Sequence, residues 1–348
     1  SEVALLPNKN LKVRDIATGK TALKFRKPGS NSPTITANPM LITGNPATTA
    51  VIQSKGSSWT GAAICSAGIA DSWFVGGSGG VTSHSVLSIV NSGLNEAIVD
   101  ISAYSEKTGV VTRAITIKSN LQINIRLDSL APGSEYTVLH LQTRSGRVTS
   151  YLFDERKKGL KFYGGDFVNS QSAPKNNLSI AGIITNPGKN GKITHSVRLL
   201  APFDSNANVN LQVLASDGVF TPVGFDSINL KAGVVKELPL NIDLGKTAIG
   251  VKVTSDQPIV ASGLRANGAT HGLGNQKWTD RQMNAACKIA FHVKMAMVPM
   301  NSNPTILCMA FQAPGRFRDS LPSLTYSVIW DSGASVSISP DKNDFVGP

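Results

Sequence analysis

The feature that most constrains this chain is an internal repeat between about residues 80 and 265, in two copies about 111 residues apart. The stretch that begins His84-Ser85-Val86 and the stretch that begins His195-Ser196-Val197 are both apolar and both end at a turn former. The stretch from Ala97 to Tyr104 alternates apolar and polar residues and corresponds to residues 208–214. Alternation of this kind is typical of half-buried strands, so each copy is predicted to be rich in β-structure.

The best match is the last part of the repeat, where residues 136–152 align without a gap to residues 248–264. Both segments are predicted to form a strand, a tight turn and a strand, with Ser145-Gly146 and Gln257-Pro258 at the turns. Each copy then offers about six or seven short strands in about 100 residues, which is the pattern of a sandwich. A propeller would require a shorter period. We therefore predict an all-β chain with two tandem immunoglobulin-like or fibronectin-like β-sandwich domains and a short, partly helical or irregular C-terminal tail.

The repeat divides the chain of 348 residues into five parts. We expect a basic N-terminal segment at 1–58, the first sandwich at 59–160, a linker at 161–177, the second sandwich at 178–268 and a divergent tail at 269–348. The linker is predicted from a stretch rich in glycine and asparagine that follows Asp154-Glu155-Arg156-Lys157-Lys158.

The charge balance of 34 basic and 22 acidic residues gives a net charge of +12. Such a surplus favours a polyanionic partner such as a nucleic acid, teichoic acid or an anionic membrane surface. The basic residues form one cluster near the N-terminus and a second cluster further on: Lys9, Lys12, Arg14, Lys20, Lys24, Arg26 and Lys27, then Arg144, Arg147, Arg156, Lys157, Lys158 and Lys161. Neither cluster contains the interleaved aromatic residues that stack on bases, so we do not expect specific nucleic-acid binding. No apolar run reaches the roughly 18 residues of a transmembrane segment.

Cofactor and metal sites are not predicted. Three cysteines, Cys65, Cys287 and Cys308, lack metal-binding spacing and allow at most one bridge, and the sequence leaves open whether Cys287 and Cys308 pair. His84 and His195 occupy equivalent places in the alignment, but without a second ligand nearby a structural role at a strand edge is the better interpretation. The run Gly76-Gly77-Ser78-Gly79-Gly80 lacks the lysine of a phosphate-binding loop and is predicted to be a flexible turn.

Several segments of the repeat resemble those of a family of secreted actinobacterial proteins described as a domain of unknown function. The resemblance rests on Trp59, Cys65, Trp73-Phe74-Val75-Gly76-Gly77, Val86-Leu87-Ser88-Ile89-Val90-Asn91, Leu130-Ala131-Pro132-Gly133 and Phe220-Thr221-Pro222-Val223-Gly224. It covers about residues 55–265, and it implies an extracytoplasmic, cell-envelope setting without a known activity. The chain begins with Ser rather than Met, which is compatible with a removed signal peptide or with a fragment.

The tail has a different composition, with five of the six methionines beyond residue 278. Asp280 is predicted to cap a helix over residues 281–297 that ends before Pro299. Further on, Tyr326-Ser327-Val328-Ile329-Trp330-Asp331-Ser332-Gly333-Ala334-Ser335 resembles the active-site turn of retropepsin-like aspartic proteases from retrotransposon polyproteins.

The resemblance to retropepsins makes Asp331, Ser332 and Gly333 the catalytic candidates of this sequence. Asp331 would need a second carboxylate to share its proton, while Ser332 and Gly333 would allow the backbone to turn tightly beneath the pair. Too few residues follow Ser335 to form the flap and closing strands of such a protease. We therefore expect that the chain does not cleave peptides.

These observations favour a secreted or envelope-associated structural and binding protein that is not an enzyme, with an anionic envelope polymer or a protein as its partner. One alternative is a fragment of a retroelement polyprotein, or a fusion with one, that carries a truncated aspartic protease motif. Another alternative is a surface adhesin that uses its basic clusters to bind anionic polymers.

Overall fold

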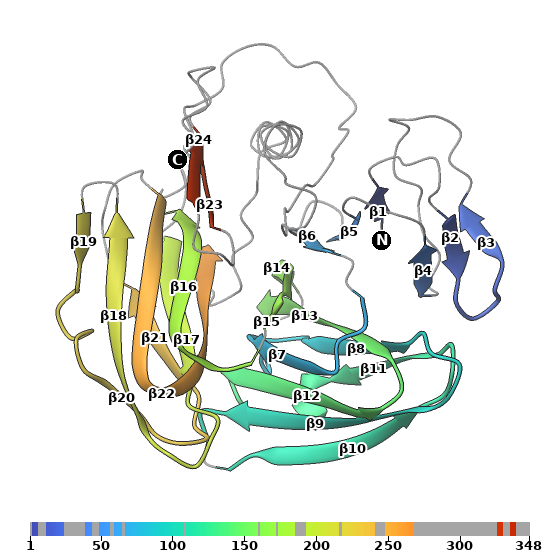
Figure 1. The fold of residues 1–348 in the computed structure, drawn as a ribbon, viewed down its shortest axis with the longest axis horizontal. Helices are drawn as coiled ribbons and strands as arrows, with labels where there is room; N and C mark the ends of the chain where they lie inside the picture. The colour runs from blue at the N-terminus through green and yellow to red at the C-terminus, as the bar shows by residue number, and fades with distance from the viewer. Residues whose placement is uncertain are drawn as a thin grey trace.

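The computed structural model describes residues 2–5, 12–23, 39–43, 49–55, 59–64, 67–107, 109–158, 161–171, 173–184, 193–215, 218–240, 248–267, 326–329 and 335–338 (Figure 1). Within these ranges the chain consists of β-strands in antiparallel sheets, with a single 3-10 turn, η1 (Leu127–Ser129). The predicted all-β, sandwich-like fold is confirmed.

The first domain is a sandwich of two sheets. One sheet has the order β10-β9-β12-β7-β15 and the other β11-β8-β13-β14. The strands are β7 (Asp71–Val75), β8 (Val86–Asn91), β9 (Ala97–Ser105), β10 (Val111–Ile117), β11 (Gln122–Arg126), β12 (Thr137–Ser145), β13 (Val148–Lys158), β14 (Lys161–Val168) and β15 (Ser170–Gln171). Alternate residues of β9, such as Val99 and Ile101, are fully buried between the sheets, as the alternation in the sequence predicts.

The second domain repeats this arrangement around one long strand. Its strands are β16 (Lys175–Ile184), β17 (Ile193–Leu200), β18 (Ala207–Ala215), β19 (Gly218–Phe220), β20 (Ile228–Leu230), β21 (Lys236–Leu240) and β22 (Ala248–Asn267). β22 pairs with β16 and β18 along its first half and with β17 along its second half. It therefore belongs to both layers of this sandwich.

The two copies have equivalent pairings. β8 pairs with β11 and β13, just as β17 pairs with β21 and β22. β9 pairs with β10 and β12, just as β18 pairs with β19 and β22. The tandem repeat is thus a repeat of topology as well as of sequence, and in Figure 1 the strands of the two domains run in crossing directions.

The register within the repeat differs from the sequence alignment at β8 and β17. The core-facing residues of β8 are Leu87 and Ile89, whereas those of β17 are Val197 and Leu199, one residue out of step with the aligned His-Ser-Val motifs. Because side chains alternate between the two faces of a strand, a shift of one residue reverses the face. His195 therefore corresponds in position to Ser85 rather than to His84.

The predicted strand, tight turn and strand at the end of each copy is also different in the structure. β12 and β13 lie in opposite sheets, and Gln257 and Pro258 lie inside β22, which continues without a break. The chain therefore crosses from one layer of the sandwich to the other at these points, instead of folding back on itself.

The predicted linker is wrong for much of its length. Residues 161–168 form β14, which pairs with β13, and β15 pairs with β7 in the other sheet of the first domain. The glycine-rich stretch thus contains two strands, and Gly164 and Gly165 are both buried within β14. In the described part of the chain, the connection between the domains is therefore confined to the few residues between β15 and β16.

The N-terminal segment also contains strands. β1 (Glu2–Leu5), β5 (Thr49–Lys55) and β6 (Trp59–Ile64) form one sheet, and β2 (Lys12–Asp15), β3 (Thr21–Leu23) and β4 (Met40–Thr43) form another. The expected boundary between residues 58 and 59 separates the paired strands β5 and β6, so it does not match the sheet. In the tail, β23 (Tyr326–Ile329) pairs with β24 (Ser335–Ile338), and the helix predicted over 281–297 lies outside the described residues.

Candidate functional site

The glycine loop, residues 76–80 between β7 and β8, is buried along its whole length. A Cβ atom on Gly79 would lie 2.0 Å from the carbonyl oxygen of Ala131, and one on Gly80 would lie 2.2 Å from a carboxylate oxygen of Glu135. Gly77 has a φ of 83°, which is costly for a residue with a Cβ atom. The prediction of a flexible turn is therefore wrong, because the backbone packs closely against Gly79 and the conformation at Gly77 favours glycine.

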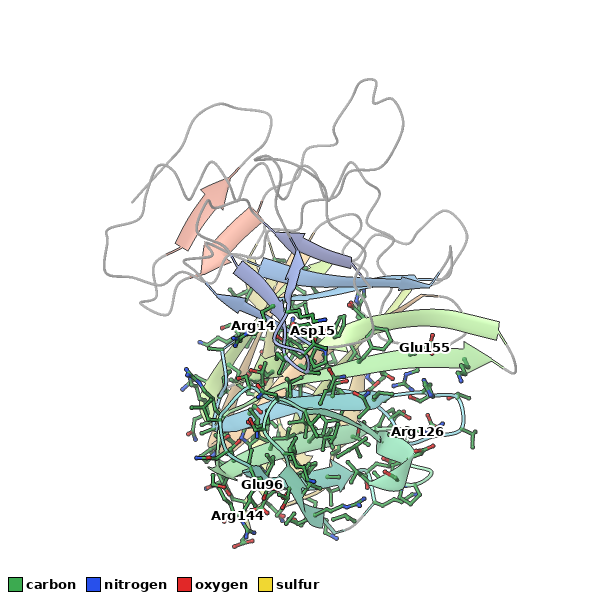
Figure 2. The ribbon with its side chains drawn as sticks, turned by 90° about the vertical axis from the view of Figure 1, so that its right-hand side faces the viewer. Arg14, Asp15, Glu96, Arg126, Arg144 and Glu155 are labelled. Carbon is green, nitrogen blue, oxygen red and sulfur yellow. The ribbon has the colours of Figure 1, made fainter. Side chains whose placement is uncertain are left out.

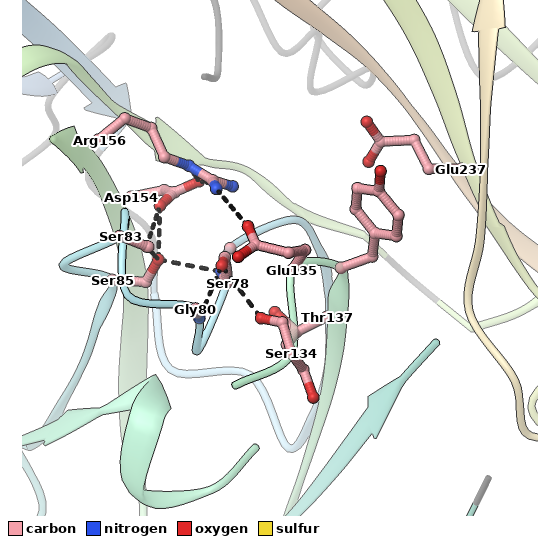
Figure 3. Close-up of polar contacts among 12 residues, drawn as sticks. Ser78, Gly80, Ser83, Ser85, Ser134, Glu135, Thr137, Asp154, Arg156 and Glu237 are labelled. Carbon is pink, nitrogen blue, oxygen red and sulfur yellow. Dashed lines mark hydrogen bonds and ion pairs between the residues drawn. The ribbon is translucent and has the colours of Figure 1, made fainter. Parts of the chain in front are cut away.

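A cluster of serines and one aspartate holds this loop against β13 (Figure 3). The hydroxyls of Ser83 and Ser85 both donate to Oδ1 of Asp154, the former at 3.1 Å. The Ser85 hydroxyl also accepts the backbone N–H of Ser78 at 3.0 Å, and the Ser78 hydroxyl accepts the backbone N–H of Gly80 at 2.9 Å. The chain reversal at residues 80–83 is thereby tied to a carboxylate that is fully buried.

Arg156 balances the charge of Asp154. The two residues are separated by one position on β13, so their side chains lie on the same face of the strand. Arg156 Nε donates to Oδ2 of Asp154 at 3.0 Å, Nη2 lies 2.9 Å from the same oxygen, and Nη1 lies 3.9 Å from Oε2 of Glu135. Burial of a charged pair is tolerated when hydrogen bonds satisfy both members, as they do here.

The burial of Arg156 also divides the second basic cluster that the sequence predicts. Arg144 bonds to Asp100 at one end of the first domain, well apart from Glu155 (Figure 2). Arg156, the neighbour of Glu155, is only 6% exposed. These basic residues therefore do not form one continuous surface.

The chemistry available to the serine cluster is limited by its own hydrogen bonds. A serine nucleophile needs a base and access to a substrate. Ser85 is buried and bound to Asp154, and both oxygens of Asp154 are occupied by the serines and by Arg156. The arrangement is therefore suited to fixing the loop and not to attacking a substrate.

Arg198 of β17 joins the second domain to this loop. Its Nη1 donates to the carbonyl oxygens of Gly77 at 2.8 Å and Thr137 at 2.9 Å in the first domain. Its Nε and Nη2 donate to Oε2 of Glu237 on β21 at 2.9 and 2.7 Å, and the guanidinium lies over the ring of Tyr136. Arg198 is only 2% exposed, and this burial lowers the pKa of its guanidinium while Glu237 opposes the shift.

An apolar cluster surrounds this contact and contains residues of both domains. Its buried members are Trp73, Val75, Tyr104 and Val138 from the first domain with Leu200, Val235 and Val260 from the second. Hydrogen bonds to backbone carbonyl groups continue the interface, since Val235 N–H donates to the carbonyl oxygen of Ser105 and the side-chain Nε2 of Gln171 donates to that of Ala261. Fully burying a large apolar side chain contributes about 1.5–3 kcal/mol, so a cluster of this size resembles a domain core more than a loose interdomain contact.

The tyrosines of this interface are affected by their surroundings. Burial raises the pKa of Tyr104, and Asp204 of the second domain raises it further. Burial likewise raises the pKa of Tyr136, followed by the effect of Glu237. Trp73 stacks on His140 at a centroid distance of 3.9 Å, and His140 Nε2 lies 3.2 Å from Oδ1 of Asp71.

The other candidate residues from the sequence are not brought together. Asp331, Ser332 and Gly333 lie outside the described residues, and the described segments on either side of them form the paired strands β23 and β24. His84 Nδ1 lies 3.5 Å from Oε2 of Glu155 in the first domain, whereas His195 is buried in the second. Among the described residues, no group of three or more His, Cys, Asp or Glu side chains is placed to bind a metal ion.

None of the segments that the structure describes forms a helix with the length and hydrophobicity needed to cross a bilayer.

The fold and the interface define a class of protein: two tandem β-sandwich domains joined by a buried contact. The model of a family of unknown function, DUF5719, matches residues 30–287, and the chain therefore belongs to this family. No curated protein sequence matches the chain.

Two solved structures share short stretches of similarity. The crystal structure of Thermotoga maritima 1070 is 19% identical over 30% of this chain and 94% of its own, with a TM-score of 0.27. The Anabaena sensory rhodopsin transducer is 24% identical over 27% of this chain and 98% of its own, with a TM-score of 0.22. At such TM-scores these likenesses carry no argument about this protein.

Proposed function

We propose that this protein is a secreted or envelope-associated structural and binding protein without catalytic activity, in which the two sandwich domains act as one rigid body. The observation that carries the proposal is the interdomain contact around Arg198. A fully buried guanidinium that bonds to carbonyl groups of the other domain is satisfied in only one relative orientation of the domains. A rigid pair of domains presents its loops and strand edges at fixed distances, which suits a partner that is bound along an extended surface.

The extracytoplasmic location is supported by the resemblance of residues 55–265 to secreted proteins. Its test is fractionation of cells that produce the full-length protein from its own gene, with a cytosolic enzyme as the marker of leakage. We expect the protein in the medium or the envelope fraction. Recovery only with the cytosolic marker would remove the location from the proposal.

The binding role is tested by sedimentation of the purified chain with isolated cell envelopes. We expect co-sedimentation of the chain, and weaker co-sedimentation of an Arg198→Met variant, because the two domains then no longer share one orientation. An Arg126→Met variant, which removes an equal charge from an ion pair that is exposed on both sides, is the matched control. Equal retention of all three proteins would contradict a role for the rigid pair.

The absence of catalysis is tested at the motif of the tail. We expect that the full chain and its Asp331→Asn variant release peptides from an unfolded protein substrate at the same background rate. Cleavage by the parent chain that Asp331→Asn abolishes would show that the protein is an aspartic protease. An adhesin based on the second basic cluster is not favoured, because Arg156 is buried and Arg144 is bonded to Asp100.

A further inference from the structure

The first domain has an open edge at β10. Within the described part of the chain, β10 pairs with β9 through all seven of its residues and pairs with no strand on its other side. The pairing with β9 contains no bulge, and the strand contains no proline. An edge strand of this kind presents a row of backbone N–H and C=O groups that can bind a further strand.

The equivalent edge of the second domain is interrupted. Beside β18, the chain forms two strands of three residues each, β19 and β20, and the segment between them contains Pro222. Gly218 and Gly224, at and near the ends of this interruption, both have positive φ. Short strands, proline and irregular backbone are the usual means of preventing additional strands from binding. The corresponding edge is therefore open in the first domain and interrupted in the second domain.

The side chains along the open edge have a distinct pattern. Val111, Arg113 and Ile115 pair with residues of β9 that face the core, so they lie on the inner face of the sheet at its rim. Val111 is 53% exposed, and Ile115 is half-buried beside the core. Arg113 is exposed, and among the described residues it has neither an ion pair nor a side-chain hydrogen bond.

The segment that contains β10 carries only basic charges. Between residues 107 and 127 the chain contains Lys107, Arg113, Lys118 and Arg126 and no acidic residue. Lys107 is engaged with the carbonyl oxygens of Pro132 and Gly133, and Arg126 is paired with Asp128. Asp100, opposite Ala114 on the neighbouring strand β9, is paired with Arg144, which leaves Arg113 on β10 and Lys118 directly after it as the available charges. A partner with acidic side chains is therefore favoured electrostatically.

We propose that β10 binds an extended peptide segment of a partner protein, which adds a strand to the sheet and places an acidic side chain opposite Arg113 with apolar residues on either side of it. The backbone of β10 would supply the hydrogen bonds, and Val111 and Ile115 would contact the apolar residues of the peptide. A second copy of this chain is a poorer occupant, because an antiparallel pair of β10 strands would bring two Arg113 side chains close together and two chains of net charge +12 repel each other. This inference rests on the binding role proposed above and names the partner class.

The experiment uses the full chain and two synthetic peptides. Both peptides alternate valine and threonine, and they differ only in a central residue, which is glutamate in one and lysine in the other. We expect the glutamate peptide to bind up to about fivefold more tightly than the lysine peptide, which is the upper end of what an exposed charge pair contributes. In the Arg113→Glu variant the preference should reverse, and in Thr116→Glu, which changes the opposite face of the same strand, it should not.

Hydrogen exchange locates the binding. The glutamate peptide should protect amides of β10 from exchange and leave those of β19 unchanged. The inference would be overturned by equal affinity for both peptides, by an unchanged preference in Arg113→Glu, or by protection of a different strand. It would also be overturned if the chain associates with itself and the Arg113→Glu substitution strengthens that association. Each of these results concerns β10 alone, so the co-sedimentation with envelopes described above can succeed while the inference fails.

Discussion

Arg198 provides the sharpest prediction from this structure. The variant Arg198→Met keeps most of the side-chain volume and removes the charge. It leaves Glu237, whose side chain is 10% exposed, without its counter-ion, and it leaves the carbonyl groups of Gly77 and Thr137 without their donor. Removing one member of a buried ion pair costs about 3–5 kcal/mol. We expect Arg198→Met to lower the free energy of unfolding by this amount.

The double variant Arg198→Met with Glu237→Leu separates the charge from the rest of the contact. It no longer contains an uncompensated buried carboxylate, so the largest part of the loss should be recovered. The two unsatisfied carbonyl groups remain and should cost about 1–3 kcal/mol. The double variant is therefore expected to be more stable than the single variant.

Urea unfolding followed by far-ultraviolet circular dichroism measures these differences. Arg126→Met is the control, because the side chains of Arg126 and its partner Asp128 are 56% and 43% exposed and their ion pair should contribute less than about 1 kcal/mol. A loss below about 1 kcal/mol in Arg198→Met, or a double variant as unstable as the single one, would refute the reasoning.

Three further predictions concern the glycine loop, the serine cluster and the interface tyrosines. Gly79→Ala should lower the midpoint of urea unfolding far more than Gly80→Ala, because the added methyl meets a backbone carbonyl in the first case and the end of a flexible side chain in the second; similar midpoints would contradict the rigid packing of the loop. Asp154→Asn should cost about 3 kcal/mol in the same assay because it leaves a buried guanidinium unbalanced, whereas Asp128→Asn at the surface should have no measurable effect. Burial raises the pKa of Tyr104 in the folded protein, so its contribution to stability should be intact below about pH 10 and should fall as the pH rises above this value. Tyr104→Phe should reduce that fall when thermal unfolding is measured across this pH range. Parallel plots of unfolding temperature against pH for the parent chain and the variant would contradict the prediction.

The strands with a clear alternation of apolar and polar residues could be predicted from the sequence. The apolar and polar pattern of β9 identifies its buried face directly, and the repeated motifs identify which strands correspond between copies. Register could not be predicted, because the paired His-Ser-Val motifs place β8 and β17 one residue out of step and only the core contacts of Leu87 and Val197 reveal the shift. The linker was predicted from composition, and composition does not distinguish a loop from a strand that contains buried glycines such as Gly164 and Gly165 of β14.

The contact around Arg198 could not be predicted from the sequence for a related reason. Arg198 lies within an apolar stretch of β17, and this isolated charge in a buried strand was the one available signal that it must meet a partner. Its partners are carbonyl groups of another domain, which no side-chain pattern can identify. Asp154 and Arg156 were regarded as part of a charged run before the linker, and Arg156 as a member of the second basic cluster, although their spacing of two residues also places both on one face of a strand.

We propose that the two sandwich domains form one rigid body, and a measurement of the distance between them tests this proposal most directly. Spin labels at Leu94 and Val223, which are 92% and 101% exposed in the first and second domains, can be attached in a chain whose native cysteines are replaced by serine. Pulsed electron paramagnetic resonance should then give a single narrow distance distribution, which broadens when Arg198 is replaced by methionine. A broad distribution in the unmodified interface, or one that Arg198→Met leaves unchanged, would contradict the account.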